Sequence, residues 1–122
     1  MALLGFTVYK EKILDGSKRQ TIRKLRKHPI LVGDKLYLYW KLRTKDCEKL
    51  GEAVCKETFT ILFKMYGLTI IKCGYGLGQF MNGEDACDLT RRDGFESLQE
   101  MFDWLKTNHH DFETKIFQVI RW

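Results

Sequence analysis

Strand patterns fill the middle of this chain without an intervening helix, and this succession constrains the fold more than any other feature. After a turn signal at Gly33 and Asp34, residues 36–41 alternate between two faces, which predicts a strand. A long strand that bends is expected over residues 50–64, and another over residues 68–73, which are rich in Ile and Thr. Several strands in succession with few helices favour mostly antiparallel pairing and a small barrel over a βαβ sheet.

The N-terminal part combines two short extended segments with one helix. Residues 3–6 are apolar and predict a strand, and helical spacing of apolar residues then predicts a helix over residues 8–15, capped by Thr7. Gly16 is a suitable residue to end this helix, because glycine adopts the left-handed conformation at low cost. Residues 20–23 follow as a short extended piece.

Two helices and a last strand are expected in the C-terminal part. Residues 84–92 have a weakly helical pattern, and Ser97 with Glu100 forms a capping box that starts the next helix. Residues 115–122 close the chain as a strand. The expected class is therefore α+β, with about five to six mostly antiparallel strands flanked by two to three helices, in a single domain that spans residues 1–122.

Composition supports a globular protein in a reducing compartment. The chain has 122 residues, of which 44% are hydrophobic and 30% charged, and it shows no linker or repeat. We expect no membrane partner, because no uncharged apolar run is long enough to span a bilayer and no signal peptide is visible. The four cysteines lack the spacing of a zinc or redox motif, so free thiols in the cytoplasm are expected.

The positive charge of the chain is concentrated in one segment. The formal net charge is +5, but residues 10–27 carry eight basic and two acidic side chains, a net +6 that leaves −1 for the remainder. Such a cluster is typical of a surface that binds a polyanion, and a solvated basic face without a partner is the alternative. The basic residues are Lys10, Lys12, Lys18, Arg19, Arg23, Lys24, Arg26 and Lys27.

Within this segment, residues 16–23 (GSKRQTIR) predict a converging site. Thr21 and Arg23 alternate in an extended piece, so their side chains should share one face. Lys18, in the tight connection before it, should reach over that face. An ammonium, a hydroxyl and a guanidinium that converge on one spot suit a phosphate, a carboxylate or the edge of a nucleobase.

The same residues carry a resemblance to a known family. The pattern G-x-K-x-x-T-x-R resembles the motif of ASCH domains, a branch of the PUA-like fold, and three further segments match in order along nearly the whole chain. The resemblance implies a twisted, partly open β-barrel flanked by helices. The matching residues are Gly16, Lys18, Thr21 and Arg23, then Val32, Gly33 and Asp34, then residues 50–55, then Asp93, Gly94 and Phe95.

The resemblance also implies a ligand. ASCH domains are proposed to bind RNA or modified nucleosides in the cleft beside the motif. One bacterial branch removes the acetyl group from N4-acetylcytidine with a lysine, a threonine and a glutamate, and another branch is reported as ribonucleases. Lys18 and Thr21 match the first two residues of the deacetylating set, and the third position falls at Asp93, a shorter carboxylate.

The chemistry of Lys18, Thr21 and Asp93 also follows from their residue types. A threonine acts as a nucleophile when a base takes its proton, and a lysine serves as that base when burial or neighbouring cations lower its pKa. Asp93 would hold the lysine or act as an acid or base. The alternative is a structural salt bridge between Asp93 and Lys18 or Arg23, with no catalysis.

The full prediction is an RNA- or nucleoside-binding domain, with a small amidohydrolase of an acylated pyrimidine nucleoside, or a ribonuclease, as the alternative. His109 and His110 are expected in a solvated loop, since no third metal ligand lies nearby. We expect no metal ion or other cofactor, and a monomer by default. Besides the four motif residues, the expected ligand-binding residues are Arg19, Lys24, Arg26 and Lys27 around the site, Tyr75 as a base-stacking residue, and Arg91 and Arg92 as an extension of the basic surface.

Overall fold

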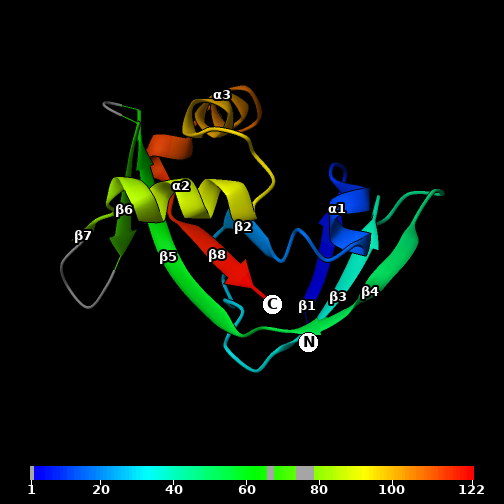
Figure 1. Ribbon diagram of the computed structural model, residues 1–122. Coiled ribbons are helices and arrows are strands. Elements are labelled where there is room, and N and C mark those ends of the chain that lie inside the picture. The colour runs from blue at the N-terminus through cyan, green and yellow to red at the C-terminus, as the bar shows by residue number, and fades with distance from the viewer. Residues whose placement is uncertain (1, 66–67, 74–78) are drawn as a thin grey trace.

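Two β-sheets organise the part of the chain that the computed structural model describes, residues 2–65, 68–73 and 79–122 (Figure 1). The first sheet has the order β1-β3-β4 and consists of β1 (Ala2–Phe6), β3 (Lys35–Trp40) and β4 (Glu48–Val54). The second has the order β2-β8-β5-β6-β7 and consists of β2 (Gln20–Lys24), β5 (Glu57–Lys64), β6 (Thr69–Cys73), β7 (Gln79–Phe80) and β8 (Phe117–Arg121). The predicted α+β class is confirmed, but the two sheets hold more strands than the five to six that the sequence predicted.

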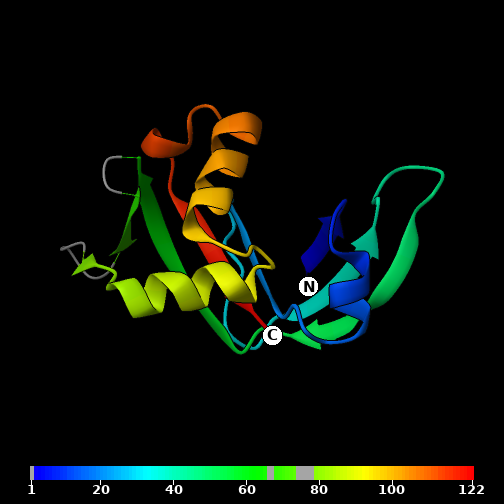
Figure 2. The ribbon, with the colours of Figure 1, turned by 45° about the horizontal axis from the view of Figure 1, so that its top comes forward.

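The helices lie beside these sheets. The two longer helices, α2 (Gly83–Arg92) and α3 (Leu98–Asn108), lie over the five-stranded sheet, and α1 (Lys10–Leu14) lies beside the three-stranded sheet (Figures 1 and 2). A short 3-10 helix, η2 (Phe112–Thr114), leads from α3 into β8. None of the helices in the described residues combines the length and the apolar character needed to cross a bilayer.

The long strand expected over residues 50–64 is in fact two strands that belong to different sheets. Between β4 and β5, the Cys55 amide donates to the Asp34 carbonyl oxygen, and the next amide, at Lys56, donates to the Arg121 carbonyl oxygen. The backbone thus changes partner within two residues, while the side chain of Cys55 is buried at the corner. The sheets diverge from this corner (Figure 1), and no closed barrel forms among the described residues.

Strand pairing is mostly antiparallel, as predicted, with one exception. β1 pairs with β3 in parallel, with Leu4 opposite Leu38, and the remaining pairs between described strands are antiparallel. The chain between β1 and β3 contains α1 and β2, which is long enough for the crossover that a parallel pair needs. This crossover also contains the basic segment, residues 16–23.

Two hydrophobic clusters hold the sheets and helices together. One packs α2 and α3 on the five-stranded sheet, around Phe63 and Phe102, whose rings meet edge to face at 5.5 Å. The other joins the three-stranded sheet to α1 and to Ile120 of β8. Val119 belongs to the first cluster and Ile120 to the second, so β8 is buried on both faces. β8 therefore ties the two halves of the core together.

The helix ends differ in detail from the prediction. α1 is shorter than the expected 8–15, and its N-cap is Tyr9, with φ at 62°, instead of Thr7. Gly16 follows α1 with φ at 82°, which confirms the predicted left-handed stop. Ser97 caps α3 as predicted by accepting from the Glu100 amide, but the Glu100 carboxylate accepts from the Glu96 amide instead of the Ser97 amide.

Candidate functional site

A cavity of about 370 Å³ lies beside β2 and is enclosed by four segments of the chain. Residues 5–9 line one side, and β2 and the residues around it line another. The turn after α2 and the side chains of Trp104 and His109 complete the wall. Lys18, Thr21, Arg23 and Asp93 all line it, so the cavity brings together the four polar residues that the sequence singles out.

The end of α2 is shaped to present Asp93 and Phe95 to this cavity. The Gly94 amide donates to the Arg91 carbonyl oxygen and the Phe95 amide to that of Thr90, the two hydrogen bonds of a Schellman ending. Gly94 has φ at 102°, and a Cβ there would lie 3.2 Å from the ring of Tyr9. Glycine is therefore required twice at this position, for its conformation and for the close approach of Tyr9.

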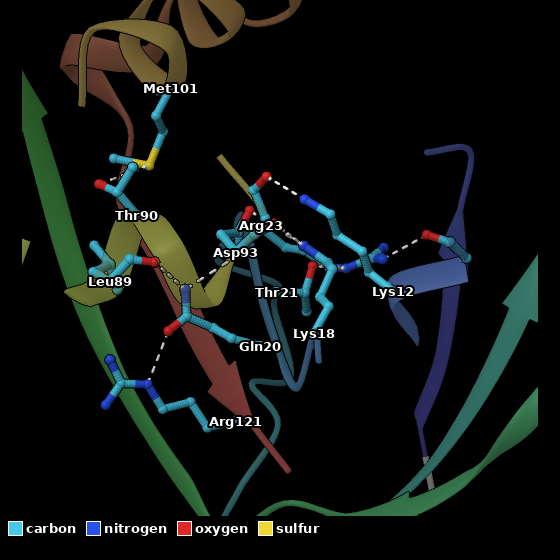
Figure 3. Close-up of polar contacts among 12 residues, drawn as sticks. Lys12, Lys18, Gln20, Thr21, Arg23, Leu89, Thr90, Asp93, Met101 and Arg121 are labelled. Atoms are coloured by element: carbon cyan, nitrogen blue, oxygen red, sulfur yellow. Dashed lines mark hydrogen bonds and ion pairs between the residues drawn. The ribbon is translucent and has the colours of Figure 1, made fainter. Parts of the chain in front are cut away.

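Lys18 and Asp93 form a buried ion pair at the base of the cavity (Figure 3). The Lys18 Nζ atom lies 3.4 Å from Asp93 Oδ2, and it also donates to the main-chain oxygen of Asp93. The two residues are only 4% and 8% exposed, so water contributes little to their solvation. This contact is the one that both interpretations of the trio require, the catalytic one and the purely structural one.

Burial shifts the pKa values of this pair in opposite directions. The pKa of Lys18 is lowered, chiefly by the loss of water around the ammonium, and Arg23 and Lys12 lower it further. The pKa of Asp93 is raised, again chiefly by burial. Attraction between the two charges opposes both shifts. Lys18 therefore releases its proton more readily than a surface lysine, which is the property a general base needs.

β2 carries Thr21 and Arg23 on one face, as the alternation predicts. The Arg23 Nε atom donates to Thr21 Oγ1 at 3.3 Å, and its Nη2 atom donates to the Gly5 main-chain oxygen. Burial, followed by the nearby charge of Arg26, lowers the pKa of Arg23 to about 10. The guanidinium thus remains a cation at neutral pH, and it holds the Thr21 hydroxyl oxygen toward the cavity.

Gln20 is a fully buried residue of the site that the sequence did not reveal. Its Nε2 atom donates to the Leu89 main-chain oxygen at 2.9 Å and to Asp93 Oδ1 at 3.3 Å (Figure 3). Arg121 Nε donates to Gln20 Oε1 at 2.9 Å, which fixes the orientation of the amide so that its NH₂ group faces Asp93. The sequence offered one signal for this role, because Gln20 is an uncharged polar residue in the middle of a basic segment.

Aromatic side chains form one wall of the cavity, and these too come from separate segments. Tyr9 meets Phe95 edge to face at 6.0 Å, Phe95 meets Trp104 at 5.9 Å, and Trp104 meets His109 at 5.4 Å. His109 lies in the loop after α3, as predicted, but it is not fully solvated: its side chain is half-buried in the cavity wall, and burial lowers its pKa. His110, in contrast, is exposed.

The cations predicted around the site divide into two groups. Lys24 and Arg26 line the cavity, although Lys24 also pairs with Asp111 at 2.9 Å. Arg19 and Lys27 are exposed and are not among its described lining residues, and Arg19 Nε donates back to the Gly16 main-chain oxygen.

Arg91 and Arg92 end α2 on its exposed side, where Arg92 pairs with Asp88 at 2.9 Å, so the described wall of the cavity does not include them. Tyr75, the predicted stacking residue, lies outside the described residues.

No group of three or more His, Cys, Asp or Glu side chains is placed to hold a metal ion among residues 2–65, 68–73 and 79–122. All four cysteines are free thiols. Comparisons with models of protein families, with curated proteins and with solved structures find no match.

Proposed function

We propose that this chain is an ASCH domain of the PUA-like class that binds a pyrimidine nucleoside, free or within RNA, in the cavity beside β2. The observation that carries the proposal is the combination of an aromatic wall with the buried Lys18–Asp93 pair at the base of one cavity. Two sheets that meet at a strand corner, with helices on the larger sheet, are compatible with a partly open barrel.

The cavity has the size and chemistry that a nucleobase needs. Its volume of about 370 Å³ falls in the range of small-molecule sites. Stacking of a base on an aromatic side chain contributes about 1–3 kcal/mol. Trp104, which is 37% exposed, supplies such a ring, while Lys18 and Arg23 offer donors and Asp93 offers an acceptor for the polar edge of the base.

RNA binding tests the first form of the proposal. We expect the affinity for single-stranded RNA to fall as salt rises, because basic side chains near the cavity would displace counterions from the phosphates. Lys18→Ala should weaken binding more than Lys27→Ala, since Lys27 is exposed and outside the described cavity wall. Affinity that is undetectable, or that is the same at low and moderate salt, would refute RNA as the ligand.

The position of Asp93 favours a second candidate function, hydrolysis of the acyl amide of a nucleoside such as N4-acetylcytidine. In this reaction Lys18, as the free amine, takes the proton of the Thr21 hydroxyl while Thr21 Oγ1 attacks the acyl carbon. Arg23 faces the oxyanion that forms, and the Lys18 ammonium returns the proton to the departing amine. Water then hydrolyses the acyl ester on Thr21, and Asp93 holds the lysine in place throughout.

Incubation with N4-acetylcytidine separates this function from binding alone. Hydrolysis predicts release of cytidine and acetate, loss of turnover in Lys18→Ala and in Thr21→Val, and normal turnover in the control Lys27→Ala. Absence of turnover at high protein concentration would leave a binding module. Turnover that survives Lys18→Ala would rule out the roles assigned here.

A further inference from the structure

We propose that a second groove next to the cavity binds the phosphate group of a ligand whose base occupies the cavity, so that the preferred ligand is a nucleotide or an RNA segment instead of a free nucleoside. The groove is named here the arginine groove, after Arg23, Arg26 and Arg43, which line it. This inference rests on the proposed function, because the cavity supplies the place for the base.

The arginine groove has a strongly one-sided composition. It has a volume of about 640 Å³, and its other described lining consists of Ala2, Leu3, Gly5 and Leu42. Three arginine residues thus line one space, and no carboxylate is among the described residues that line it. Guanidinium groups match the oxygens of a phosphate through paired N–H donors, which makes arginine the preferred residue for such a ligand.

The arginine side chains of the groove form no direct ion pair within the described part of the chain. The hydrogen bonds of Arg23 go to the Thr21 hydroxyl and the Gly5 main-chain oxygen, and Arg26 Nη2 donates to the Leu3 main-chain oxygen at 3.2 Å. No ion pair joins Arg23, Arg26 or Arg43 to a carboxylate in residues 2–65, 68–73 and 79–122. Burial, followed by repulsion from Arg26, lowers the pKa of Arg23 against the attraction of Asp93, and a bound anion would relieve the repulsion.

Gly5 explains how Arg43 reaches this position. A Cβ at Gly5 would lie only 2.9 Å from the Cβ atom of Leu42, closer than two such atoms can approach. The missing side chain therefore lets the loop after β3 close on β1, where the Lys41 amide donates to the Phe6 main-chain oxygen. Arg43 follows with its backbone φ at 67°, in the left-handed region that residues other than glycine rarely adopt.

The cavity and the arginine groove are neighbours along one surface. Gly5, Arg23 and Arg26 line both of them, so the two spaces adjoin at these residues. Arg23 is held where the two spaces adjoin by its hydrogen bonds to the Thr21 hydroxyl and the Gly5 main-chain oxygen. A base in the cavity would thereby place the sugar near Arg23 and a phosphate among the three guanidinium groups.

The test compares cytidine with ligands that carry the same nucleoside and one or more phosphates. Calorimetric titrations at low salt would measure the dissociation constants of cytidine, cytidine 5′-monophosphate, cytidine 3′-monophosphate and a short cytidine-rich RNA. We expect at least one phosphorylated probe to bind about tenfold or more tightly than cytidine, as a charge-assisted contact implies. A gain with a mononucleotide would identify a nucleotide as the source of the phosphate, and a gain with the oligonucleotide alone would identify the RNA backbone.

Arg43→Gln tests the assignment of the groove, and Lys45→Gln is the matched control from the same loop, because Lys45 is exposed and does not line the described groove. The ratio of the cytidine and phosphorylated-ligand dissociation constants should fall toward one in Arg43→Gln and stay unchanged in Lys45→Gln. Equal affinities for all probes in the wild type, or a ratio that survives Arg43→Gln, would overturn the inference.

Inorganic phosphate distinguishes failure of the groove from failure of the proposed function. Its titration, followed by the NMR signals of the arginine side chains, reports on the groove without any nucleoside. If phosphate shifts the Arg43 signal while no nucleoside or nucleotide binds, the groove is supported as an anion site and the proposed nucleoside binding is refuted. If phosphate leaves the arginine signals unchanged and phosphorylated probes bind no better than cytidine, the groove is refuted as a phosphate site, while nucleoside binding in the cavity is still supported.

Discussion

Removing either member of the Lys18–Asp93 pair should destabilise the fold, with opposite dependences on pH. Loss of one partner from a buried ion pair costs about 3–5 kcal/mol. In Asp93→Asn the main-chain oxygen at position 93 still accepts from Lys18, and Lys18 can lose its proton, so we expect the lower end, about 3 kcal/mol at neutral pH. That is a large part of the roughly 5–15 kcal/mol that stabilises a domain of ordinary size.

The pH dependence follows from which charge is left behind. In Asp93→Asn the attraction that raises the pKa of Lys18 is gone, so this pKa falls further below its unfolded value and the folded state binds fewer protons than the unfolded state. The deficit should therefore shrink as pH rises toward about 10, the ordinary lysine pKa. In Lys18→Met the pKa of Asp93 rises further, so the deficit should shrink as pH falls toward about 4, the ordinary aspartate pKa.

Urea unfolding of the wild type and both variants at about pH 5, 7 and 9 would measure these deficits, since the range lies between the two ordinary pKa values. The double variant Lys18→Met/Asp93→Asn should recover part of the loss, because it leaves no unpaired buried charge. Deficits that stay constant with pH, or that move in the reverse directions, would refute the description of this pair as buried and coupled.

Three further substitutions test the parts of the site independently. Gly94→Ala should lower the free energy of unfolding by about 1–2 kcal/mol, because alanine is strained at the positive φ of this position. The loss should exceed that of Gly33→Ala, since position 33 has a similar φ but open space where the Cβ would lie. Thermal melts of the two variants would show whether contact with Tyr9 adds to the loss. Gln20→Leu removes three side-chain hydrogen bonds, those to the Leu89 main-chain oxygen and to Asp93 Oδ1 and the one from Arg121 Nε, and should cost about 2–3 kcal/mol in urea unfolding. A loss below about 1 kcal/mol would mean that these hydrogen bonds contribute little. Trp104→Ala should weaken cytidine binding about tenfold in a calorimetric titration, and unchanged affinity would exclude stacking on this ring.

Local patterns in the sequence predicted the features that depend on neighbouring residues. The alternation of Thr21 and Arg23 in β2, the stop at Gly16 and the Ser97 cap are all confirmed, because each is decided by backbone geometry within a few residues. The contact between Lys18 and Asp93 spans 75 residues, and only the resemblance to ASCH domains pointed to Asp93. Periodicity carries no information on which distant segments meet.

The features missed from the sequence all depend on such distant contacts. The change of sheet at Cys55 leaves the extended pattern of residues 50–64 intact, so a bend and a change of partner look alike in the sequence. The sequence places Trp104 in a helix and His109 in the loop after it. Their shared position in the cavity wall arises only when α3 packs beside Phe95.

A titration of the uniformly labelled protein with cytidine and with N4-acetylcytidine, followed by NMR, tests the central claim most directly. Binding in the cavity predicts saturable shifts of the Thr21 and Phe95 amides and of the Trp104 indole, with little change at Lys27 on the exposed rim. Absence of saturable shifts for both ligands, or shifts confined to residues away from β2 and the end of α2, would contradict the assignment of this cavity as a nucleoside site.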